Sequence, residues 1–428
     1  MSHTTGVKRS QGRNAVSLVD AYRRVRADSE ALCAPLRTED YCIQTMPDVS
    51  PAKWHLAHTS WFFETFLLKP HLPGYQEFHP GFAFLFNSYY EQVGPFFPRP
   101  QRGLLSRPTV AEVLAYRQHV DEAMARLLTQ VEPARLAELQ GVLLVGLNHE
   151  QQHQELLLMD VKYNLSINPL YPAYTQAPPP SPRAALQEGL NSSISHPGGV
   201  CVIGDDGLAG FAYDNEGPRH KVLLEPFRLA RRLVTCGEYL AFIEAGGYRD
   251  PTLWMSDGWA HVQRHGWTAP LYWVQSAEGW QVFTLHGLRP LDLQAPVGHL
   301  SWYEADAFAR FAGQRLPTEA EWEVALVAGN FRQELAAIQP EYLEPHAGGM
   351  QFFGALWQWT ASPYVPYPRY RPVAGALGEY NGKFMAGQMV LRGSACITPP
   401  AHARATYRNF FPPQARWMYG GVRLAQDA

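Results

Sequence analysis

The chain of 428 residues has little cysteine and no long uninterrupted apolar run. Its five cysteines are odd in number, widely spaced and without a Cys-x-x-Cys pair, which argues against a disulfide framework and against a cysteine zinc site. No segment approaches the ~20 apolar residues of a membrane span, and no apolar core of signal-peptide type follows the polar N-terminus. We therefore expect a cytoplasmic protein.

The sequence also lacks an excess of positive charge. Its 36 Lys and Arg residues stand against 39 Asp and Glu residues, for a net charge of -3 and a pI near 6.6. Without a basic stripe or block, neither nucleic acid nor a membrane surface is an expected partner. With 46% hydrophobic residues the chain can bury a large core, and its length favours two domains. We expect small-molecule partners.

The most informative segment that is present is His149-Glu150-Gln151-Gln152-His153-Gln154-Glu155. Residues four apart share a helix face, so His149 and His153 can bind one metal ion, and Gln152 lies on the same side. As a His-Glu-x-x-His pattern the segment predicts a zincin-like metallopeptidase with Glu150 as general base. As His-x3-His-x-Glu it matches a different helical metal site. Two structural histidines are the third interpretation.

A second histidine-rich segment runs from Ser50 to Glu64. Ser50 suits an N-cap and a proline follows it, which predicts a helix over Pro51–Leu68. His58 falls on the second turn among apolar residues, where an unpaired imidazole is costly. We predict His58 as the third metal ligand, with His55 as a competitor for that role and a purely structural histidine as the alternative.

The two halves of the sequence differ in periodicity. Apolar residues recur at helical spacing throughout the first half, and a Thr109-x-x-Glu112 capping box begins the third segment. This pattern predicts a four-helix bundle, and bundles build metal sites between facing helices. The predicted helices are Ala15–Leu36, Pro51–Leu68, Pro108–Gln130 and Pro133–Leu165.

After Val200 this periodicity mostly stops, and short segments rich in glycine and aromatic residues predict an irregular α+β domain. Helical patterns there are limited to 235–245, 303–311 and 318–328. The fold class is thus an α-helical bundle plus an α+β domain. The predicted division is a bundle with the metal site over 1–170, a proline-rich linker over 171–196 and the α+β domain over 197–428.

The connection from Lys69 to Arg107 is unusually long, and its aromatic content argues against disorder. Tyr89 and Tyr90 are adjacent, so one of the two phenols can face the metal site as a proton source, the alternative being stacking within the loop. Arg99 and Arg102 are candidates to clamp an anionic group, although arginines more often form surface salt bridges.

Both halves carry motifs of known families. The first half, with His58 and His-x3-His-x-Glu, resembles a DinB-like four-helix bundle. The second resembles the formylglycine-generating-enzyme (sulfatase-modifying-factor) type of C-type-lectin-like domain, through Phe211–His220, Arg315–Glu323, Leu356–Thr360 and Gly420–Leu424. In this order the motifs resemble the non-haem iron synthases that act on hercynine, the trimethylated betaine of histidine. These are the ergothioneine sulfoxide synthases and the selenoneine synthases.

The resemblance implies an oxygen-dependent Fe(II) oxidoreductase that forms a C–S or C–Se bond at the imidazole C2 of hercynine. It implies Fe(II) held by His58, His149 and His153, with Tyr89 or Tyr90 as the catalytic proton donor. The expected partners are hercynine, dioxygen and a selenosugar or thiol donor. The implied substrate-binding residues are Gln152 for the imidazole, Asn409 for the carboxylate, and Phe410 and Phe411 for the trimethylammonium group.

One departure from the ergothioneine branch concerns the donor. Positions that commonly carry an Arg-His pair read Phe96-Phe97 here, and aromatic side chains suit the apolar face of a sugar. We therefore favour a selenoneine synthase with a selenosugar donor. The alternative is a sulfoxide synthase that binds the carboxylate of cysteine or gamma-glutamylcysteine through Arg99 and Arg102. A zincin-like metallopeptidase and a non-catalytic lectin-like binding module remain the rival classes.

Overall fold

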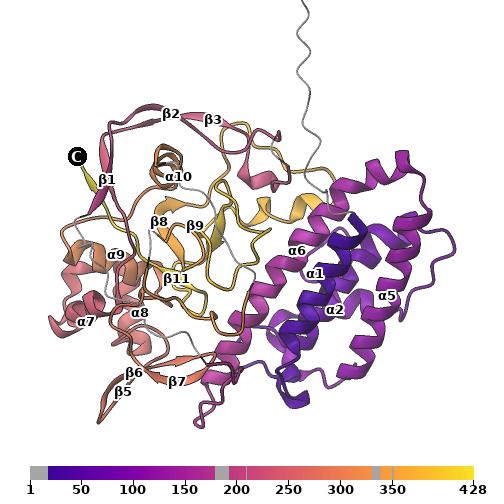
Figure 1. Cartoon of the computed structure of the whole chain (residues 1–428), viewed down its shortest axis with the longest axis horizontal. Helices are drawn as coiled ribbons and strands as arrows, with labels where there is room; N and C mark the ends of the chain where they lie inside the picture. The colour runs from indigo at the N-terminus through magenta and orange to yellow at the C-terminus, as the bar shows by residue number, and fades with distance from the viewer. Residues whose placement is uncertain (1–17, 179–191, 209, 330–337, 349–350) are drawn as a thin grey trace, which may run out of the picture.

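The computed structural model describes residues 18–178, 192–208, 210–329, 338–348 and 351–428. Figure 1 shows a helical half, in indigo and magenta, beside a mixed half of short strands and helices. This arrangement confirms the fold class predicted from the sequence. The predicted linker over 171–196 lies partly outside the described residues, and its last four residues form a strand, Ser193–His196.

Four long helices pack side by side in the helical half (Figure 1). The second of them is the centre of the bundle, since every one of its residues is buried and it contacts both the third and the fourth. Such burial requires apolar residues on all sides of the helix. The four helices are α1 (Leu18–Cys33), α2 (Ala52–Phe63), α5 (Val110–Gln130) and α6 (Pro133–Ser166).

The capping box predicted at the start of α5 is present. The Thr109 side chain accepts a hydrogen bond from the backbone N–H of Glu112. The predicted N-cap of α2 is not observed, because Ser50 does not cap this helix. The Ser50 backbone N–H donates instead to Asp160 Oδ2 at 2.7 Å. The first helix ends at Cys33, three residues earlier than predicted.

Short helical segments extend α2 and interrupt the long connection that follows it. Beyond Phe63 the chain continues through a π-helical turn and one further turn, and the connection then folds against α2 before α5 begins. These segments are the π-helical turn Glu64–Leu68, α3 (Lys69–His71), α4 (Phe82–Phe86) and the 3₁₀ turn Arg99–Leu104.

The mixed half contains four small sheets within the described residues. A four-stranded sheet has the order β10-β9-β8-β11, with β11 parallel to β8; the others have the orders β1-β4-β12, β5-β6-β7 and β2-β3. The strands are β1 (Ser193–His196), β2 (Gly199–Ile203), β3 (His220–Leu224), β4 (Phe227–Ala230), β5 (Trp273–Ser276), β6 (Gly279–Thr284), β7 (Gly287–Pro290), β8 (Trp357–Pro363), β9 (Met389–Gly393), β10 (Asn409–Phe411), β11 (Gly420–Gly421) and β12 (Ala425–Asp427).

The helices of the mixed half are α7 (Cys236–Glu244), α8 (Ser256–His265), α9 (Trp302–Phe311) and α10 (Glu319–Ala328). Three of them match the predicted helical patterns to within a residue or two. The sequence prediction missed α8, a short helix whose polar residues outnumber its apolar ones.

The two halves meet along α6, which lies between the rest of the bundle and the strands (Figure 1). Glu155 on α6 accepts hydrogen bonds from Trp357 Nε1, at 2.7 Å, and from the Thr398 hydroxyl. Further along the same helix, Lys162 Nζ forms an ion pair with Glu344 at 2.6 Å. These contacts are buried or partly buried, so the mixed half is held on one helix of the bundle.

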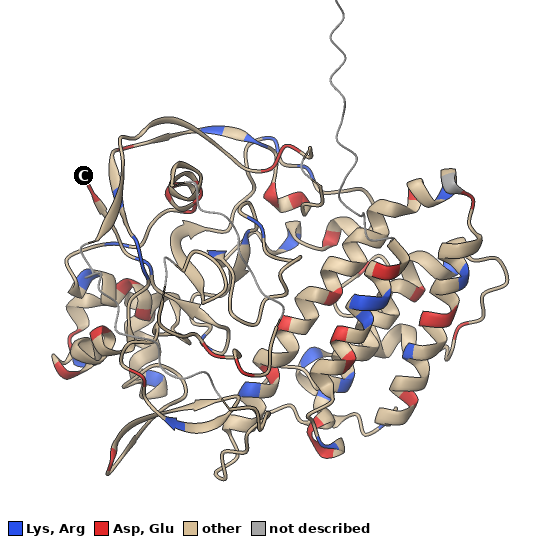
Figure 2. Ribbon diagram, in the orientation of Figure 1, with Lys and Arg blue, Asp and Glu red and all other residues tan. Residues whose placement is uncertain are grey.

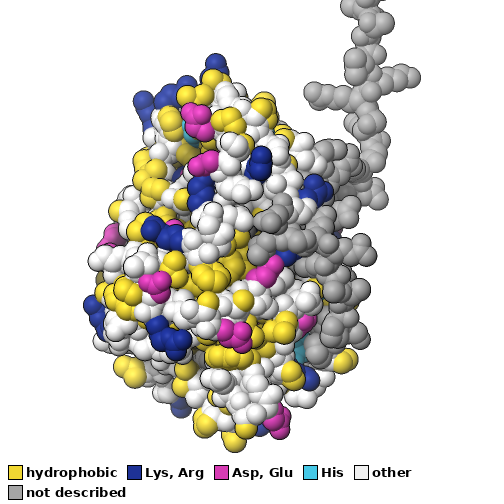
Figure 3. All heavy atoms as spheres, turned by 90° about the vertical axis from the view of Figure 1, so that its left-hand side faces the viewer, with side chains coloured by type: hydrophobic (Ala, Val, Ile, Leu, Met, Phe, Trp, Pro, Cys, Tyr) yellow, Lys and Arg dark blue, Asp and Glu magenta, His cyan; other side chains and the backbone are white. Residues whose placement is uncertain are grey.

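Charges of both signs are spread along the ribbon without a stripe of one sign (Figure 2). The face of the mixed half in Figure 3 shows isolated acidic and basic side chains among hydrophobic and neutral ones. None of the described helices combines the length and the apolar character needed to cross a membrane.

Candidate metal centre and substrate cavity

Three histidines converge where α2 faces α6. Potential ligand atoms of His58, His149 and His153 all lie within 4.8 Å of one another. Nε2 of His58 and Nε2 of His149 are 3.1 Å apart, and both side chains are buried. The helical spacing that the sequence predicts thus brings two of the imidazoles together, and α2 supplies the third.

The three imidazoles are neutral. Burial lowers the pKa of His149 to about 3 and lowers the pKa of His58 and of His153 well below the ordinary value. His58 Nδ1 lies 2.6 Å from the Phe86 carbonyl, which can only accept, so this nitrogen carries the proton and Nε2 keeps its lone pair. Neutral imidazoles with free lone pairs are the form that binds metal ions.

The donor set fits a first-row transition metal. Imidazole nitrogen suits Fe(II), Zn(II) and Cu(II), and three ligands from one side leave coordination positions for small molecules. The described residues bring no carboxylate into this group. The set is therefore three histidines, rather than two histidines and a carboxylate.

Glu150 does not face the metal centre. Its carboxylate accepts from Arg117 Nη2 at 2.6 Å, Arg26 Nη1 at 3.0 Å and Ser29 Oγ at 2.7 Å. Burial alone would raise its pKa, but the two guanidinium groups and the hydroxyl lower the pKa to about 2. Glu150 is thus a paired structural anion inside the bundle, and the zincin interpretation, which requires it as general base, is wrong.

A cavity of about 350 Å³ opens beside the histidines. His149 and His153 lie at its wall, and both halves of the chain contribute to it. Most of the residues predicted from the sequence to bind substrate line this cavity, namely Arg99, Arg102, Gln152, Asn409, Phe410 and Phe411, and so does Tyr89, a predicted proton donor.

One part of the cavity wall is cationic. Arg102 is buried, its Nη1 donates to Ser50 Oγ at 2.9 Å, and its guanidinium lies 3.3 Å from the centre of the Trp54 ring. Trp54 in turn stacks on His58, with ring centres 4.5 Å apart. Arg99 is more exposed and donates to the Asp48 carbonyl. Both arginines retain further N–H groups for an anionic ligand.

Another part of the wall is aromatic and comes from the mixed half. Strand β10 places Asn409, Phe410 and Phe411 at the cavity, and Phe410 is fixed by stacking on Tyr364 with ring centres 4.1 Å apart. Aromatic faces attract quaternary ammonium groups, and none of the described residues at the cavity wall is a lysine that would compete with them.

The phenol nearest the histidines is one that sequence reasoning missed. Tyr380 lies with its ring centre 5.6 Å from that of His149, and its hydroxyl donates to Gln152 Oε1. Burial raises its pKa well above the ordinary value, so the phenol stays protonated. It follows a 3₁₀ turn, Ala376–Glu379, in a loop whose sequence carries no motif.

Tyr89 and Tyr90 stack on each other with ring centres 4.8 Å apart. Only Tyr89 lines the cavity; Tyr90 is fully buried behind it against Trp61. The pair therefore combines the two interpretations of the sequence, since one ring faces the cavity and the other packs within the loop.

Phe96 and Phe97 are not brought to the cavity. The Phe97 N–H donates to the Phe84 carbonyl at 3.0 Å, and the two rings meet edge to face. The cavity lining therefore gives no support to the expectation that this pair binds the donor, and the Phe97 ring packs against Phe84 of α4 instead.

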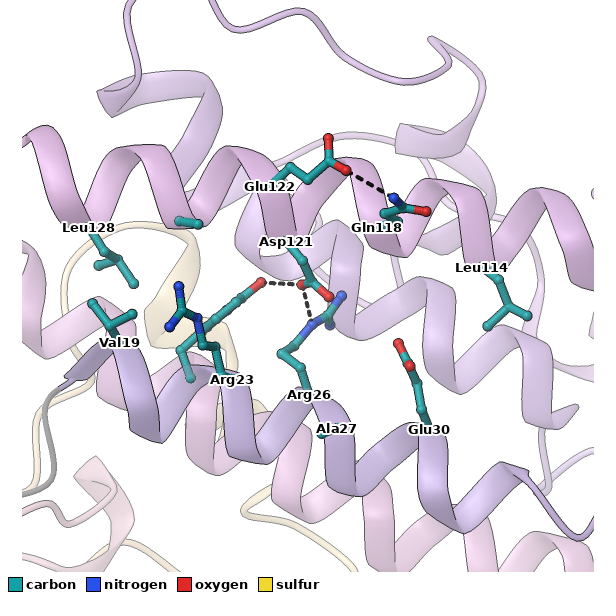
Figure 4. Close-up of a pocket in the computed structure, with 12 residues that line it drawn as sticks. Val19, Arg23, Arg26, Ala27, Glu30, Leu114, Gln118, Asp121, Glu122 and Leu128 are labelled. Carbon is teal, nitrogen blue, oxygen red and sulfur yellow. Dashed lines mark hydrogen bonds and ion pairs between the residues drawn. The ribbon is translucent and has the colours of Figure 1, made fainter.

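A wider hollow of about 640 Å³ lies between α1 and α5 (Figure 4). Tyr22 and Arg26 both donate to Asp121 at 2.6 Å at this hollow, and charged side chains border it. None of the described residues that line it is a histidine. The smaller cavity is therefore the candidate site.

Family models match two successive parts of the chain. A family model described as the DinB superfamily matches residues 21–157, and one described as a sulfatase-modifying factor enzyme 1-like domain matches residues 179–345. The chain is similar to formylglycine-generating enzyme from Streptomyces coelicolor, with 34% identity over 35% of this chain and 54% of that protein.

The similarity to two other relatives extends over both halves. Hercynine oxygenase from Mycobacterium tuberculosis is 31% identical over 91% of this chain and 93% of its own length. Hercynine oxygenase from Mycolicibacterium thermoresistibile is 32% identical over 89% of this chain and 88% of its own length. With both domains and the three-histidine centre in place, the chain belongs to the hercynine oxygenase family of oxidoreductases.

Proposed function

We propose that this protein is an oxygen-dependent Fe(II) enzyme that joins the sulfur of a thiol to the imidazole C2 of hercynine. The observation that carries the proposal is the cavity itself, where His149 and His153 of the three-histidine group adjoin both a cationic and an aromatic wall. His58, His149 and His153 would hold the iron. Iron bound there supplies the activation of dioxygen.

The overall reaction balances with one dioxygen. The C2–H bond of hercynine and the S–H bond of the thiol are broken, and a C–S bond and an S=O bond form. One oxygen atom is retained in the sulfoxide and the other leaves as water with the two hydrogens. The product is a sulfoxide, and no further reductant is required.

The aromatic wall suits hercynine. Phe410 and Phe411 offer ring faces to the trimethylammonium group, and the Asn409 side chain offers its amide N–H groups to the carboxylate. Gln152 is positioned beside the histidines and is held by Tyr380, so its amide would orient the substrate imidazole.

The cationic wall suits a donor with a carboxylate. Arg99 and Arg102 line the cavity, and a guanidinium binds a carboxylate through two parallel N–H groups. The aromatic pair that favoured a selenosugar, Phe96 and Phe97, lies outside the cavity. We therefore prefer cysteine or gamma-glutamylcysteine as donor over a selenosugar.

Tyr380 is the proton donor of this proposal. Its ring lies against His149, whereas no contact among the described residues joins Tyr89 or Tyr90 to the three histidines. Burial raises the pKa of Tyr380, so its hydroxyl keeps the proton until a stronger base forms nearby. Tyr89 would line the donor side of the cavity instead.

The test is product analysis by mass spectrometry. Protein loaded anaerobically with Fe(II) is exposed to dioxygen and hercynine with cysteine, gamma-glutamylcysteine or a selenosugar in parallel reactions, and Zn(II)-loaded protein is the control. We expect a sulfoxide adduct when the donor is a thiol. The Fe(II)-loaded protein should form it, and the Zn(II)-loaded control should not. An adduct from the selenosugar only would reverse the donor assignment, and no adduct from any donor would refute the function.

A further inference from the structure

A hydrogen-bonded chain lies behind His153. Its Nδ1 is 2.9 Å from Nδ1 of His55, and His55 Nε2 is 3.0 Å from Oδ2 of Asp160. Asp160 follows His153 by about two turns of α6, and His55 reaches both from α2. His55 and Asp160 are 4% and 3% exposed, so water does not compete effectively for these bonds.

The carboxylate sets the direction of this chain. An ionised Asp160 only accepts, so Nε2 of His55 must carry the hydrogen that it donates. A neutral imidazole has one N–H, which leaves Nδ1 of His55 as an acceptor. His153 must then donate its Nδ1–H to that acceptor, and Nε2 of His153 keeps its lone pair.

We propose that Asp160 and His55 are positioning residues that hold His153 in its Nδ1–H tautomer and direct Nε2 toward the metal. The inference rests on the proposed function in one respect, since it requires a metal at the three-histidine centre. His55, which competes with His58 for the ligand role in the sequence, thereby has a distinct role behind the ligand set.

The other two histidines are supported differently. His58 donates to a neutral backbone carbonyl, that of Phe86, and His149 Nδ1 has no hydrogen-bond partner within the described residues. Among the residues that the structure describes, a carboxylate lies behind His153 alone, through His55. A carboxylate behind an imidazole raises the basicity of the ligand, so His153 would be the strongest donor of the three.

The same carboxylate also connects to the cationic wall. Asp160 Oδ2 accepts from the Ser50 N–H at 2.7 Å, and Ser50 Oγ accepts from Arg102 Nη1 at 2.9 Å. One carboxylate oxygen therefore fixes both the beginning of α2 beside Arg102 and the orientation of His153. The metal centre and the proposed donor site share this support.

Cobalt(II) binding to the metal-free full chain tests the inference through the visible absorption of the bound ion. His55→Phe keeps a ring but removes both hydrogen bonds, whereas His55→Gln keeps one acceptor and one donor. We expect His55→Phe to weaken binding about 10- to 100-fold and His55→Gln to restore most of the affinity. The control is His286→Phe, which alters a buried histidine of the mixed half that bonds the Pro340 carbonyl.

A second readout needs neither metal nor turnover. Nitrogen-15 NMR of histidine-labelled, metal-free protein distinguishes the two imidazole tautomers by their long-range couplings. We expect His153 to carry its proton on Nδ1 in the wild type and in His55→Gln. In His55→Phe, we expect a mixture of the two tautomers.

The outcomes separate this inference from the proposed function. Equal cobalt affinity of His55→Phe and the wild type, or a wild-type His153 protonated on Nε2, would overturn the inference and leave the function standing. An equal loss of affinity in His286→Phe would also overturn it, because general destabilisation would then explain the effect. Failure of the wild type to bind cobalt would refute the three-histidine metal centre, and both proposals with it.

Discussion

The helical half and the mixed half contribute different chemistry to one cavity. The bundle supplies the imidazoles, such as His58 and His149, from rigid helices whose spacing fixes the nitrogens relative to each other. The mixed half supplies Tyr380, Asn409 and Phe410 from a loop and a short strand. Metal coordination tolerates little displacement, whereas recognition surfaces on loops change readily. We infer that the bundle sets the type of reaction and the mixed half adapts it to a substrate.

The largest expected effect is the loss of metal binding, and it distinguishes the role of the bundle from that of the mixed half. His149→Ala should abolish metal binding and product formation, because it removes one of the three ligands and one of the two that α6 supplies. Phe410→Leu should retain the metal and raise KM for hercynine, because it removes an aromatic face only. Metal content after Fe(II) loading and steady-state kinetics measure the two effects. Normal metal content in His149→Ala would contradict the metal assignment.

The next effect concerns Tyr380, a residue of the mixed half that lies against His149 of the bundle. Tyr380→Phe should keep the metal affinity and lower kcat about 100-fold, because a positioned proton donor typically contributes that much. Tyr213→Phe is a matched control, since its hydroxyl lies 3.3 Å from that of Tyr380, but no contact among the described residues joins Tyr213 to the three histidines. Tyr89→Phe and Tyr90→Phe should have smaller effects. A larger fall in Tyr89→Phe than in Tyr380→Phe would reassign the proton donor.

A smaller effect concerns the cationic wall. Arg99→Gln should raise KM for the thiol donor about tenfold while KM for hercynine stays unchanged, because it removes one charge-assisted hydrogen bond. Arg107→Gln provides the control, since Arg107 lies outside the cavity and bonds its neighbouring Ser106 carbonyl. Parallel changes in both KM values would show that Arg99 does not discriminate between the two substrates.

The last effect concerns stability and tests how the halves are held together. Burial raises the pKa of Glu155 from 4.5 to about 7, so the native protein keeps this proton at a pH where the unfolded chain loses it. This contribution to stability is complete below pH 4.5 and is lost as the pH rises through about 7. It amounts to on the order of 3 kcal/mol.

Urea unfolding of the metal-free wild type and of Glu155→Gln between pH 4.5 and 8 measures this loss. The wild type should lose stability relative to the variant as the pH rises, since glutamine does not titrate. Parallel pH profiles for the two proteins would show that Glu155 is already ionised in the folded state.

Much of the bundle could be predicted because its information is local. Helical spacing places His149 and His153 on one face, and the capping box at Thr109 marks a helix start, so no knowledge of distant contacts is needed. The orientation of Glu150 could not be predicted in this way. It depends on Arg26 and Arg117, which meet it only after three helices have packed.

The wall from the mixed half was predicted only in part. Asn409, Phe410 and Phe411 form a strand, and a polar amide beside two aromatic rings identified them as candidates. Tyr380 lies in an irregular loop, and its approach to Gln152 joins residues 228 positions apart. The prediction for Phe96 and Phe97 shows the converse. Their aromatic side chains suit a ligand, but the path of the chain leaves them outside the cavity.

Helix α6 carries His149, His153, Glu155, Asp160 and Lys162 in one continuous run, and these residues contact partners in α2 and in the mixed half. One inserted or deleted residue in this run would turn everything beyond it by about 100° and shift it by about 1.5 Å along the axis. The number of residues in this stretch therefore sets the relative positions of the metal centre and the mixed half. Individual side chains along it can be exchanged during evolution, but its length cannot change without separating the metal centre from the domain that covers it.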